Sequence, residues 1–538
     1  MDFVFEDNPI AASDLGEHHY SGSLGDVGPD AVEQRTSARV RLLDQLRAVD
    51  RTTLDSVQRL DLDVALADAA TAVRLDEHVR WRQRAAYWYP EQLGRAFNVP
   101  VSRTYAPAPA RAEHLLQRLR DAPAFLADGS ATLGTDIPEL WRSFAVAAAR
   151  GVSSFVTTAV RPFAHELDAA LAGDIDRAAD GVITAVDRFV DDLAARDLAP
   201  TATWAEGGEH IDGVLRELHL LDLDHQQLRE FGEASLAEER KRLEDFAAGI
   251  DASRPWPEQI ARIKDRHPAP DDFLEVYRHE MDRARAHTVA ASLATLPPGE
   301  ECRMAWVPEF LRSSLPIAVM HTTPPFEDGL ISEWWITPSD PSAPADRRLQ
   351  QQRDNCYVFA ESIAGHEIYP GHHLQKVHHK LATAGSRIRR YFSSPLFVEG
   401  WGLYVEDLFE ETGFFDNPDV LLFKHRNSTW RSVRVVIDVG LHTGTLSFDD
   451  AVDLLSAEAG MDRHMAEGEI NRYCRHDNAT YQSSYLLGKR AIQQLRDDVQ
   501  RREGNAFRLG DFHDRLMSFG SVPVSLIAER LLDDQPAG

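Results

Sequence analysis

Cysteine is scarce in this chain, and so are long apolar runs and positive charge. The 538 residues include three cysteines, too few for a disulfide framework or a four-cysteine zinc site. No stretch approaches the roughly 18–20 uninterrupted apolar residues that span a bilayer. The 86 acidic and 58 basic residues give a formal net charge of −28, which repels nucleic-acid phosphates and anionic lipid. We therefore expect no nucleic-acid and no membrane partner.

An export signal is also lacking from the first residues. The segment MDFVFEDNPI carries acids where a signal peptide needs a basic region, and no apolar region follows it. The small number of cysteines is consistent with a reducing compartment. We expect a cytoplasmic protein, and the sequence leaves its oligomeric state open.

The chain is 43% hydrophobic and 27% charged, which is the composition of a globular protein with a large core. Residues 1–35 are rich in Gly, Ser, Asp and Pro and predict a flexible N-terminal arm. In residues 36–296 apolar residues recur at three- and four-residue steps, which predicts a scaffold lobe of amphipathic helices. Residues 297–538 are expected to form the catalytic, metal-binding lobe. The two lobes are expected to make one continuous, mainly α body.

Two short β-rich runs interrupt the helical pattern. Pro316–Met320 and Leu330–Thr337 are separated by a turn with two prolines and a glycine, and they predict strands of a small sheet. The second run comes shortly before the histidine-rich segment, where an edge strand could bind an extended peptide by strand addition. Trp334 and Trp335 either alternate between the core and a ligand or pack the sheet against helices.

Histidine is concentrated in one segment, because five of the 22 histidines lie between 366 and 379. Its other residues are mostly apolar, and polar groups in such a setting need partners, which a metal ion supplies. The pair His366-Glu367 matches the start of the metallopeptidase helix HExxH. In that helix two histidines four residues apart bind Zn²⁺, and the glutamate is the general base. The pair therefore predicts metal-assisted hydrolysis.

The spacing of the next histidines differs from HExxH, because they follow His366 by six and seven residues. On an unbroken helix His373 would lie about 10 Å along the axis, too far to share an ion with bonds of about 2 Å. Pro370 removes a backbone donor and Gly371 permits unusual dihedral angles, so we expect the helix to bulge or break there. Either His372 or His373 is then the second ligand, and the Gly-His match favours His372.

A third ligand is expected on a following helix. Glu399 lies in the segment FVEGWGLYVE (397–406), and with two imidazoles its carboxylate completes a His₂Glu site that leaves one position open for water. One Zn²⁺ suits this ligand set, although Mn²⁺, Co²⁺ or Fe²⁺ could also occupy it. Glu406, two turns further along, is expected either to be solvated or to orient a ligand.

Three segments resemble the DUF885 family of bacterial proteins: HEIYPGHHLQ (366–375), FVEGWGLYVEDL (397–408) and RVVIDVGLH (434–442). The family is regarded as zincin-like. The resemblance therefore implies a helical metallopeptidase architecture with a small sheet next to the metal helix, and a Zn²⁺-dependent hydrolase of peptide or amide bonds.

One family motif is altered in this chain. Family members commonly read RYxxxPxQAxSYxxG near the C-terminus, whereas here Arg472-Tyr473-Cys474 is followed by RHDNATYQS (475–483), without the proline, and then by Ser484-Tyr485. The tyrosine is kept but the spacing is longer. We therefore expect the substrate-facing end of the pocket to differ from that of relatives.

The remaining candidates serve the reaction beside the metal. Glu367 is expected to take a proton from water and to deliver it to the leaving amine. The developing oxyanion needs a donor, for which Tyr485, His373 and His442 are candidates. A phenol donates without titrating near neutral pH, which favours Tyr485. The alternative is that Tyr485 has only a structural role in the core.

Two arginines are candidates for binding substrate. The guanidinium groups of Arg434 and Arg472 could clamp a substrate carboxylate, because their fork matches it bidentately; a structural role is the alternative. His442 lies one turn after Asp438, so it either contacts substrate or is oriented by a hydrogen bond with that carboxylate.

The sequence thus predicts a zinc-dependent hydrolase that acts on short peptides. One alternative is a zinc hydrolase or lyase of a non-peptide small molecule. Another is a non-catalytic metal-binding protein on a peptidase-like fold. The retained Glu367 argues against the last, because a structural zinc has no use for that carboxylate.

Overall fold

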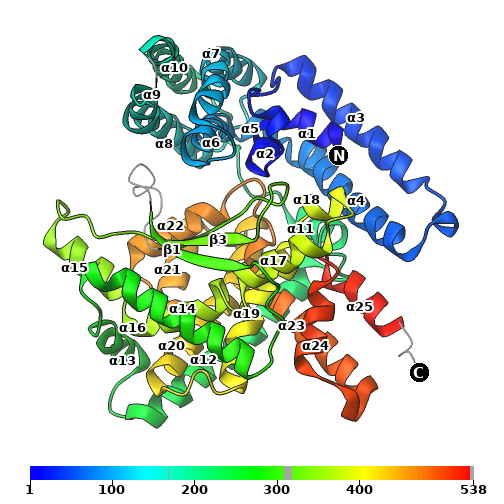
Figure 1. Cartoon of the computed structure of the whole chain (residues 1–538), viewed down its shortest axis with the longest axis vertical. Coiled ribbons are helices and arrows are strands. Elements are labelled where there is room, and N and C mark those ends of the chain that lie inside the picture. Colours follow the sequence, from blue (N-terminus) through cyan, green and yellow to red (C-terminus); the bar gives the residue numbers. More distant parts are fainter. Residues whose placement is uncertain (168, 308–317, 534–538) are drawn as a thin grey trace.

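The computed structural model describes residues 1–167, 169–307 and 318–533. It confirms the predicted mainly α fold with one small sheet (Figure 1). An upper group of helices comes from the N-terminal part of the chain, and a larger lower body comes from the rest. The sheet lies between them, at the top of the lower body.

The first 35 residues are folded, so the predicted flexible arm is wrong. Helices α1 (Asp2–Asp7) and α2 (Pro9–Asp14) place Phe5 and Ile10 in the interior, each 1% exposed. The carboxylate of Asp7 pairs with three arginines from later helices. Helices of six residues are too short to show the apolar period of a long helix, which is why the composition suggested a loop.

The upper group of helices has a core of its own, with members from Ile10 to Leu193. The longest helix of this upper group, α10, lies along α7. The main helices of the N-terminal 200 residues are α3 (Pro29–Arg47), α4 (Ser56–Arg74), α6 (Trp88–Ser102), α7 (Ala108–Thr132), α8 (Glu139–Phe155) and α10 (Ala169–Ala195).

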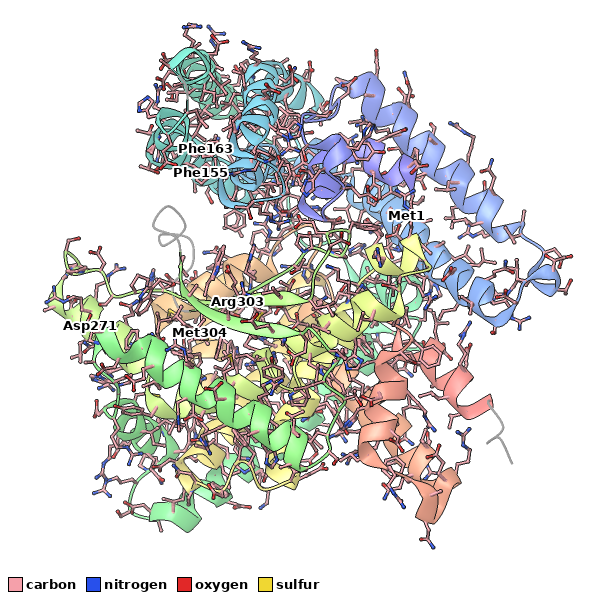
Figure 2. All side chains as sticks on the ribbon, viewed as in Figure 1. Met1, Phe155, Phe163, Asp271, Arg303 and Met304 are labelled. Atoms are coloured by element: carbon pink, nitrogen blue, oxygen red, sulfur yellow. The ribbon has the colours of Figure 1, made fainter. Side chains whose placement is uncertain are left out.

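One helical stretch, Glu139–His165, is long and apolar enough to cross a bilayer by length and composition alone. The core helix of a soluble protein passes the same test, so one such helix is weak evidence. Here Trp141 and Val152 pack in the upper core. Phe155 and Phe163 lie in the same group of helices (Figure 2).

The lower body surrounds a second core that crosses the predicted lobe boundary at residue 296. Tyr277, before that boundary, and Trp401, after it, belong to this same core. Its main helices are α11 (Gly208–Glu217), α12 (His225–Asp251), α13 (Trp256–Lys264), α14 (Phe273–Ala290), α15 (Ala345–Asp354), α16 (Tyr357–Glu367), α17 (His372–Ala382), α19 (Pro395–Glu411), α20 (Pro418–His442), α21 (Phe448–Ala459), α22 (Arg463–Tyr473), α23 (Tyr481–Glu503), α24 (Leu509–Met517) and α25 (Val524–Asp533).

The sheet has the order β1-β3-β2. Strand β1 (Glu301–Trp306), which the sequence reading missed, is parallel to β3 (Ile331–Ile336), and β2 (Ala318–Thr322) is antiparallel to β3. The predicted run Leu330–Thr337 is confirmed as β3. The other predicted strand overlaps β2, and its first two residues, 316 and 317, lie outside the described residues.

Both tryptophans of β3 are buried. Trp334 is fully buried and packs edge-on against Tyr277 of α14, with ring centroids 4.9 Å apart. Trp335 is 8% exposed and stacks on His321 of β2. Both side chains therefore pack the sheet, and neither points outward as the strand-addition hypothesis required.

Helices α19 and α23 cross in the lower body at two glycines. A Cβ atom on Gly488 of α23 would lie 1.8 Å from the carbonyl oxygen of Leu396, and one on Gly400 of α19 would lie 2.5 Å from Gly488. Only residues without a side chain allow this approach. The crossing places Gly488 of α23 against the first two turns of α19, where the predicted ligand Glu399 lies.

Candidate metal centre

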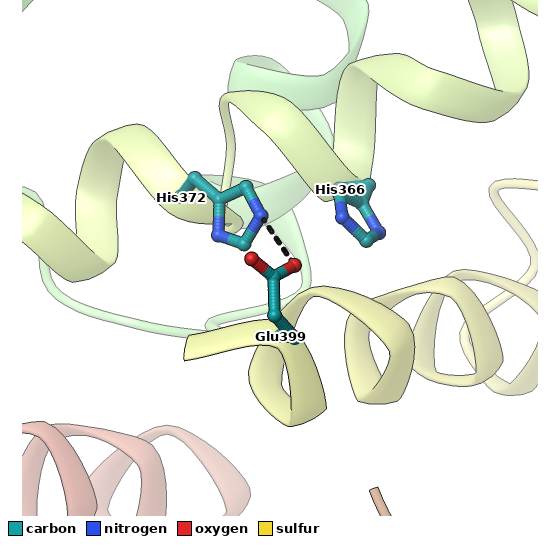
Figure 3. A group of neighbouring side chains, drawn as sticks. All are labelled: His366, His372 and Glu399. Carbon is teal, nitrogen blue, oxygen red and sulfur yellow. Dashed lines mark ion pairs between the residues drawn. The ribbon is translucent and has the colours of Figure 1, made fainter. Parts of the chain in front are cut away.

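Three predicted ligands meet in the structure. His366 is near the end of α16, His372 begins α17, and Glu399 lies on α19 (Figure 3). Their candidate ligand atoms all lie within 4.8 Å of one another, and Nε2 of His372 is 3.7 Å from Oε2 of Glu399. Donor atoms bound tetrahedrally to one Zn²⁺ at about 2.0–2.2 Å lie about 3.4 Å apart. Small side-chain shifts would therefore let the three hold one ion.

The two histidines converge because the helix breaks between them. Helix α16 ends at Glu367 and α17 begins at His372, with a cis peptide before Pro370. A Cβ atom on Gly371 would lie 1.9 Å from the carbonyl oxygen of His366, so glycine is needed for the chain to turn back. The two imidazole centroids are 4.7 Å apart. The predicted break at Pro-Gly is confirmed.

His373 lies outside the cluster, contrary to its prediction as an oxyanion donor or ligand. It is fully buried, with Nε2 2.9 Å from Glu300 and Nδ1 2.8 Å from Ser332 of β3. Burial raises the pKa of Glu300, but hydrogen bonds from His373, Tyr369 and Arg285 outweigh it and bring this pKa to about 2. Adjacent residues of a helix point in different directions, so His373 anchors α17 to the sheet while His372 faces the cluster.

Two further side chains orient the predicted ligands. Nδ1 of His366 lies 2.8 Å from a carboxylate oxygen of the buried Glu406, which leaves Nε2 for a metal. The hydroxyl of Tyr481 donates a 2.8 Å hydrogen bond to Oε1 of Glu399. Burial would raise the pKa of Glu399, but His372 outweighs it and holds this pKa well below its usual range. Tyr481 was missed by the sequence reading, although it lies in the altered segment.

Two cavities meet at this cluster. The arginine cavity, of about 610 Å³, is bordered by Lys376, Arg431, Arg434, Arg472, Tyr481 and Tyr485. The apolar cavity, of about 410 Å³, is bordered by Phe359, Ile363, Phe423, Trp430, Met461 and Met465. Three residues, His366, Glu367 and Arg431, border both cavities. The predicted general base therefore lies where the two cavities join.

The carboxylate of Glu367 is available for chemistry. Among the described residues it has no hydrogen-bond partner and no ion-pair partner. It follows the predicted ligand His366 directly in the chain and borders both cavities. Glu367 is half-buried, and the predicted role requires a carboxylate that water can reach.

The two predicted substrate arginines border the arginine cavity. Arg434 is 3% exposed and donates to Glu469 at 2.8 Å and to the hydroxyl of Tyr473 at 2.7 Å. Arg472 donates to the same carboxylate at 2.9 Å. The sequence reading missed Arg431, one turn before Arg434 on α20, although the i, i+3 spacing places both on one helix face.

Tyr485 also lies in the site, as predicted. It is 8% exposed and borders the arginine cavity. The guanidinium carbons of Arg431 and Arg434 lie 5.6 and 5.0 Å from its ring centroid. Its hydroxyl is therefore held near the cluster by two cations that pack on its ring.

His442 does not bind substrate in the way predicted. It is 2% exposed, its Nε2 lies 3.1 Å from the carbonyl oxygen of Tyr473, and the described borders of the two cavities do not include it. The expected hydrogen bond with Asp438 is also wrong, because the two groups are 3.7 Å apart. Asp438 instead accepts hydrogen bonds from Ser483 and Thr480 and so holds the start of α23. Burial raises the pKa of Asp438 to about 6.

Two solved structures share this fold along nearly their whole length, and both proteins are named a "putative lipoprotein". One, of unknown function, is from Shewanella oneidensis, with a TM-score of 0.83, 19% identity, and coverage of 99% of this chain and 98% of that one. The other is from Colwellia psychrerythraea, with a TM-score of 0.83, 16% identity, and coverage of 98% and 96%. At these identities the likeness shows the fold alone.

No curated protein matches the chain. The family model described as "Bacterial protein of unknown function (DUF885)" matches residues 9–531. That match spans both helix groups, the sheet and the histidine-carboxylate cluster. The chain therefore belongs to the DUF885 family.

Proposed function

We propose that this protein is a zinc-dependent hydrolase of peptide or amide bonds that acts on short peptides. The observation that carries the proposal is the convergence of His366, His372 and Glu399 beside the unpaired carboxylate of Glu367. Two imidazoles and a carboxylate, with a fourth position open, are a ligand set of catalytic zinc sites. Glu406 fixes the orientation of His366, as such sites require.

The metal and the side chains would have separate roles in the reaction. A zinc ion held by the three ligands would polarise the scissile carbonyl and lower the pKa of a nearby water. Glu367 takes a proton from that water and delivers it to the leaving nitrogen. Tyr485 donates a hydrogen bond to the oxygen on which negative charge develops. Tyr481 holds Oε1 of Glu399, so that Oε2 faces His372.

A zinc hydrolase or lyase of a non-peptide small molecule is the second candidate. The observation that favours it is the altered segment 475–483, because Tyr481 from this segment contacts the carboxylate of the predicted ligand Glu399. A change so close to the reacting centre is where a change of substrate class would be expected. The alternative of a non-catalytic metal protein leaves the unpaired Glu367 without a role.

The test combines metal content with activity. The purified full-length chain is loaded with zinc, its metal content is measured by elemental analysis, and it is assayed against a library of di- and tripeptides. We expect one zinc per chain and cleavage of a subset of the peptides. Stoichiometric zinc with no peptide cleaved would favour the non-peptide alternative, and a chain that binds no transition metal would overturn the proposal.

A further inference from the structure

Arg431 is a cation without a close ion-pair partner among the described residues, and it lies where the two cavities meet. Its Nε and Nη1 atoms are buried and have no hydrogen-bond partner. Within the part of the chain that the structure describes, no carboxylate oxygen lies within 4.0 Å of its guanidinium nitrogens. A buried charge is normally paired, so an unpaired guanidinium that borders a cavity indicates a missing anionic partner.

The surroundings of Arg431 increase this excess of positive charge. Arg434 and Arg472 pair with the single carboxylate of Glu469, whereas Arg431 is attracted from beyond ion-pair distance by Glu406, which is itself paired with His366. Nη1 of Arg434 and Nε of Arg472 are also buried without partners. Burial, together with repulsion from Arg434, lowers the pKa of Arg431. Four basic side chains, Lys376 and the three arginines, border the arginine cavity together with two carboxylates, Glu367 and Glu399.

The apolar cavity has a different chemistry. It presents two phenylalanines, two methionines, an isoleucine and a tryptophan, beside charged groups that include Lys264, Arg426 and Asp462. Such a surface gains free energy by removing an apolar group of a ligand from water. Glu367 borders this cavity and the arginine cavity alike. One molecule could therefore place an apolar group on one side of the general base and an anionic group on the other.

We propose that the substrate carries a carboxylate, which docks on Arg431 in the arginine cavity, and an apolar group, which fills the apolar cavity. The scissile amide then lies between them, beside Glu367. This inference rests on the proposed hydrolase function and names its substrate class: a peptidyl or N-acyl amino acid with an apolar acyl side. A planar guanidinium binds a carboxylate with two parallel hydrogen bonds, which fixes the amide relative to the cluster.

The proposed reaction is the hydrolysis of the amide by one water. The oxygen of one water bonds to the carbonyl carbon, and the C–N bond breaks with its electron pair on nitrogen. The nitrogen takes up the proton that Glu367 held. The products are an apolar carboxylic acid and an amine that retains the carboxylate bound by Arg431, and no other reactant is needed.

The carboxylate site can be tested by binding, without turnover. The probes are 3-phenylpropanoate and its neutral counterpart 3-phenylpropanamide, titrated by calorimetry into the zinc-free full-length chain. We expect the acid to bind at least about tenfold more tightly than the amide, because a charge-assisted bidentate hydrogen bond is lost in the amide. Arg431→Gln should remove this preference and Arg431→Lys should retain part of it, because lysine keeps the charge but not the fork.

Arg229→Gln is the matched control, because Arg229 is an exposed arginine on α12 that pairs with Glu233. It should bind both probes as the wild type does. Thermal unfolding of each variant establishes that it is folded before binding is compared. The proposal is overturned if the acid does not bind, if acid and amide bind equally, or if folded Arg431→Gln retains the full preference.

A second experiment determines which carboxylate of the substrate binds Arg431. The zinc-loaded chain is given Phe-Phe-Ala with a free C-terminus, the same peptide amidated, and amidated Phe-Phe-Asp. Cleavage of the first alone assigns the α-carboxylate, and cleavage of the third assigns a side-chain carboxylate. Equal cleavage of all three overturns the inference. If none is cleaved while the acid still binds through Arg431, the carboxylate site stands and the peptide hydrolase is wrong.

Discussion

Nδ1 of His366 lies 2.8 Å from Oε1 of Glu406, forty residues away in the chain. This contact determines which imidazole nitrogen can face a metal, because the nitrogen that donates to the carboxylate cannot also bind an ion. It also decides between the two roles expected for Glu406: the carboxylate is buried and orients a ligand.

Glu406→Gln should therefore weaken metal binding by about 10–100-fold, because a neutral amide is a poorer acceptor for the imidazole N–H. Competition with a chelator of known zinc affinity measures the change. Glu411→Gln is the control, because Glu411 lies at the exposed end of the same helix and pairs with Arg496. Equal zinc affinities for the two variants would contradict this role for Glu406.

Glu367→Gln should leave zinc content unchanged and reduce turnover of any cleaved peptide by about 10²–10⁴-fold, the usual contribution of a general base. The substitution keeps the size of the side chain but removes its ability to accept a proton. Glu233→Gln, at an exposed carboxylate on α12, should retain wild-type turnover. Full activity in zinc-loaded Glu367→Gln would exclude this residue as the base.

Gly371→Ala should disrupt the turn that joins α16 to α17. The added Cβ atom would meet the carbonyl oxygen of His366 at 1.9 Å, so the backbone must shift. We expect a loss of about 1–3 kcal/mol in the free energy of unfolding, together with weaker zinc binding. Denaturant unfolding and metal analysis measure the two effects.

Gly385→Ala provides the comparison for this steric prediction, because a Cβ atom there would meet nothing within 4 Å. This variant should keep the stability and zinc affinity of the wild type. If Gly371→Ala behaves in the same way, the turn is less constrained than its geometry indicates.

Acid should destabilise the fold through buried neutral histidines such as His513. This imidazole contacts the carbonyl oxygen of Leu293 at 2.6 Å and the hydroxyl of Tyr404 at 2.8 Å, and burial lowers its pKa to about 4. An unfolded histidine titrates near 6.5, so between about pH 6.5 and 4 the unfolded chain binds more protons. The stability that His513 contributes is therefore present above pH 6.5 and is lost as the pH falls toward 4.

His513→Gln should reduce the slope of unfolding free energy against pH in this window by up to about 1.4 kcal/mol per pH unit, the value for one proton. Urea unfolding at a series of pH values measures it. His464→Gln is the control, because His464 is exposed. A slope for His513→Gln equal to that of the wild type would show that His513 binds a proton to the same extent in the folded and unfolded states.

The sequence was most informative where chemistry depends on local spacing. Pro370-Gly371 predicted the helix break, and the break brings His366 and His372 together with Glu399. The relative positions of residues that are close along the chain can be predicted from sequence, because helix geometry fixes them.

Roles that depend on distant partners could not be predicted in this way. His373 was placed in the site from its neighbours, but its partner Glu300 lies 73 residues earlier in the chain. The significance of Arg431 is that no described carboxylate pairs with it, and a sequence does not show which charges remain unpaired. Two helices of six residues in the first 35 positions were not predicted for a different reason: short helices show little periodicity.

The contact between Gly400 and Gly488 also has a mechanical consequence. With their backbones touching, α19 and α23 move as one rigid piece, so Glu399, Tyr481 and Tyr485 keep their relative positions. An opening that admits a bulky molecule is then expected in the other elements that border the arginine cavity, among them β2 with Met320 and Thr322.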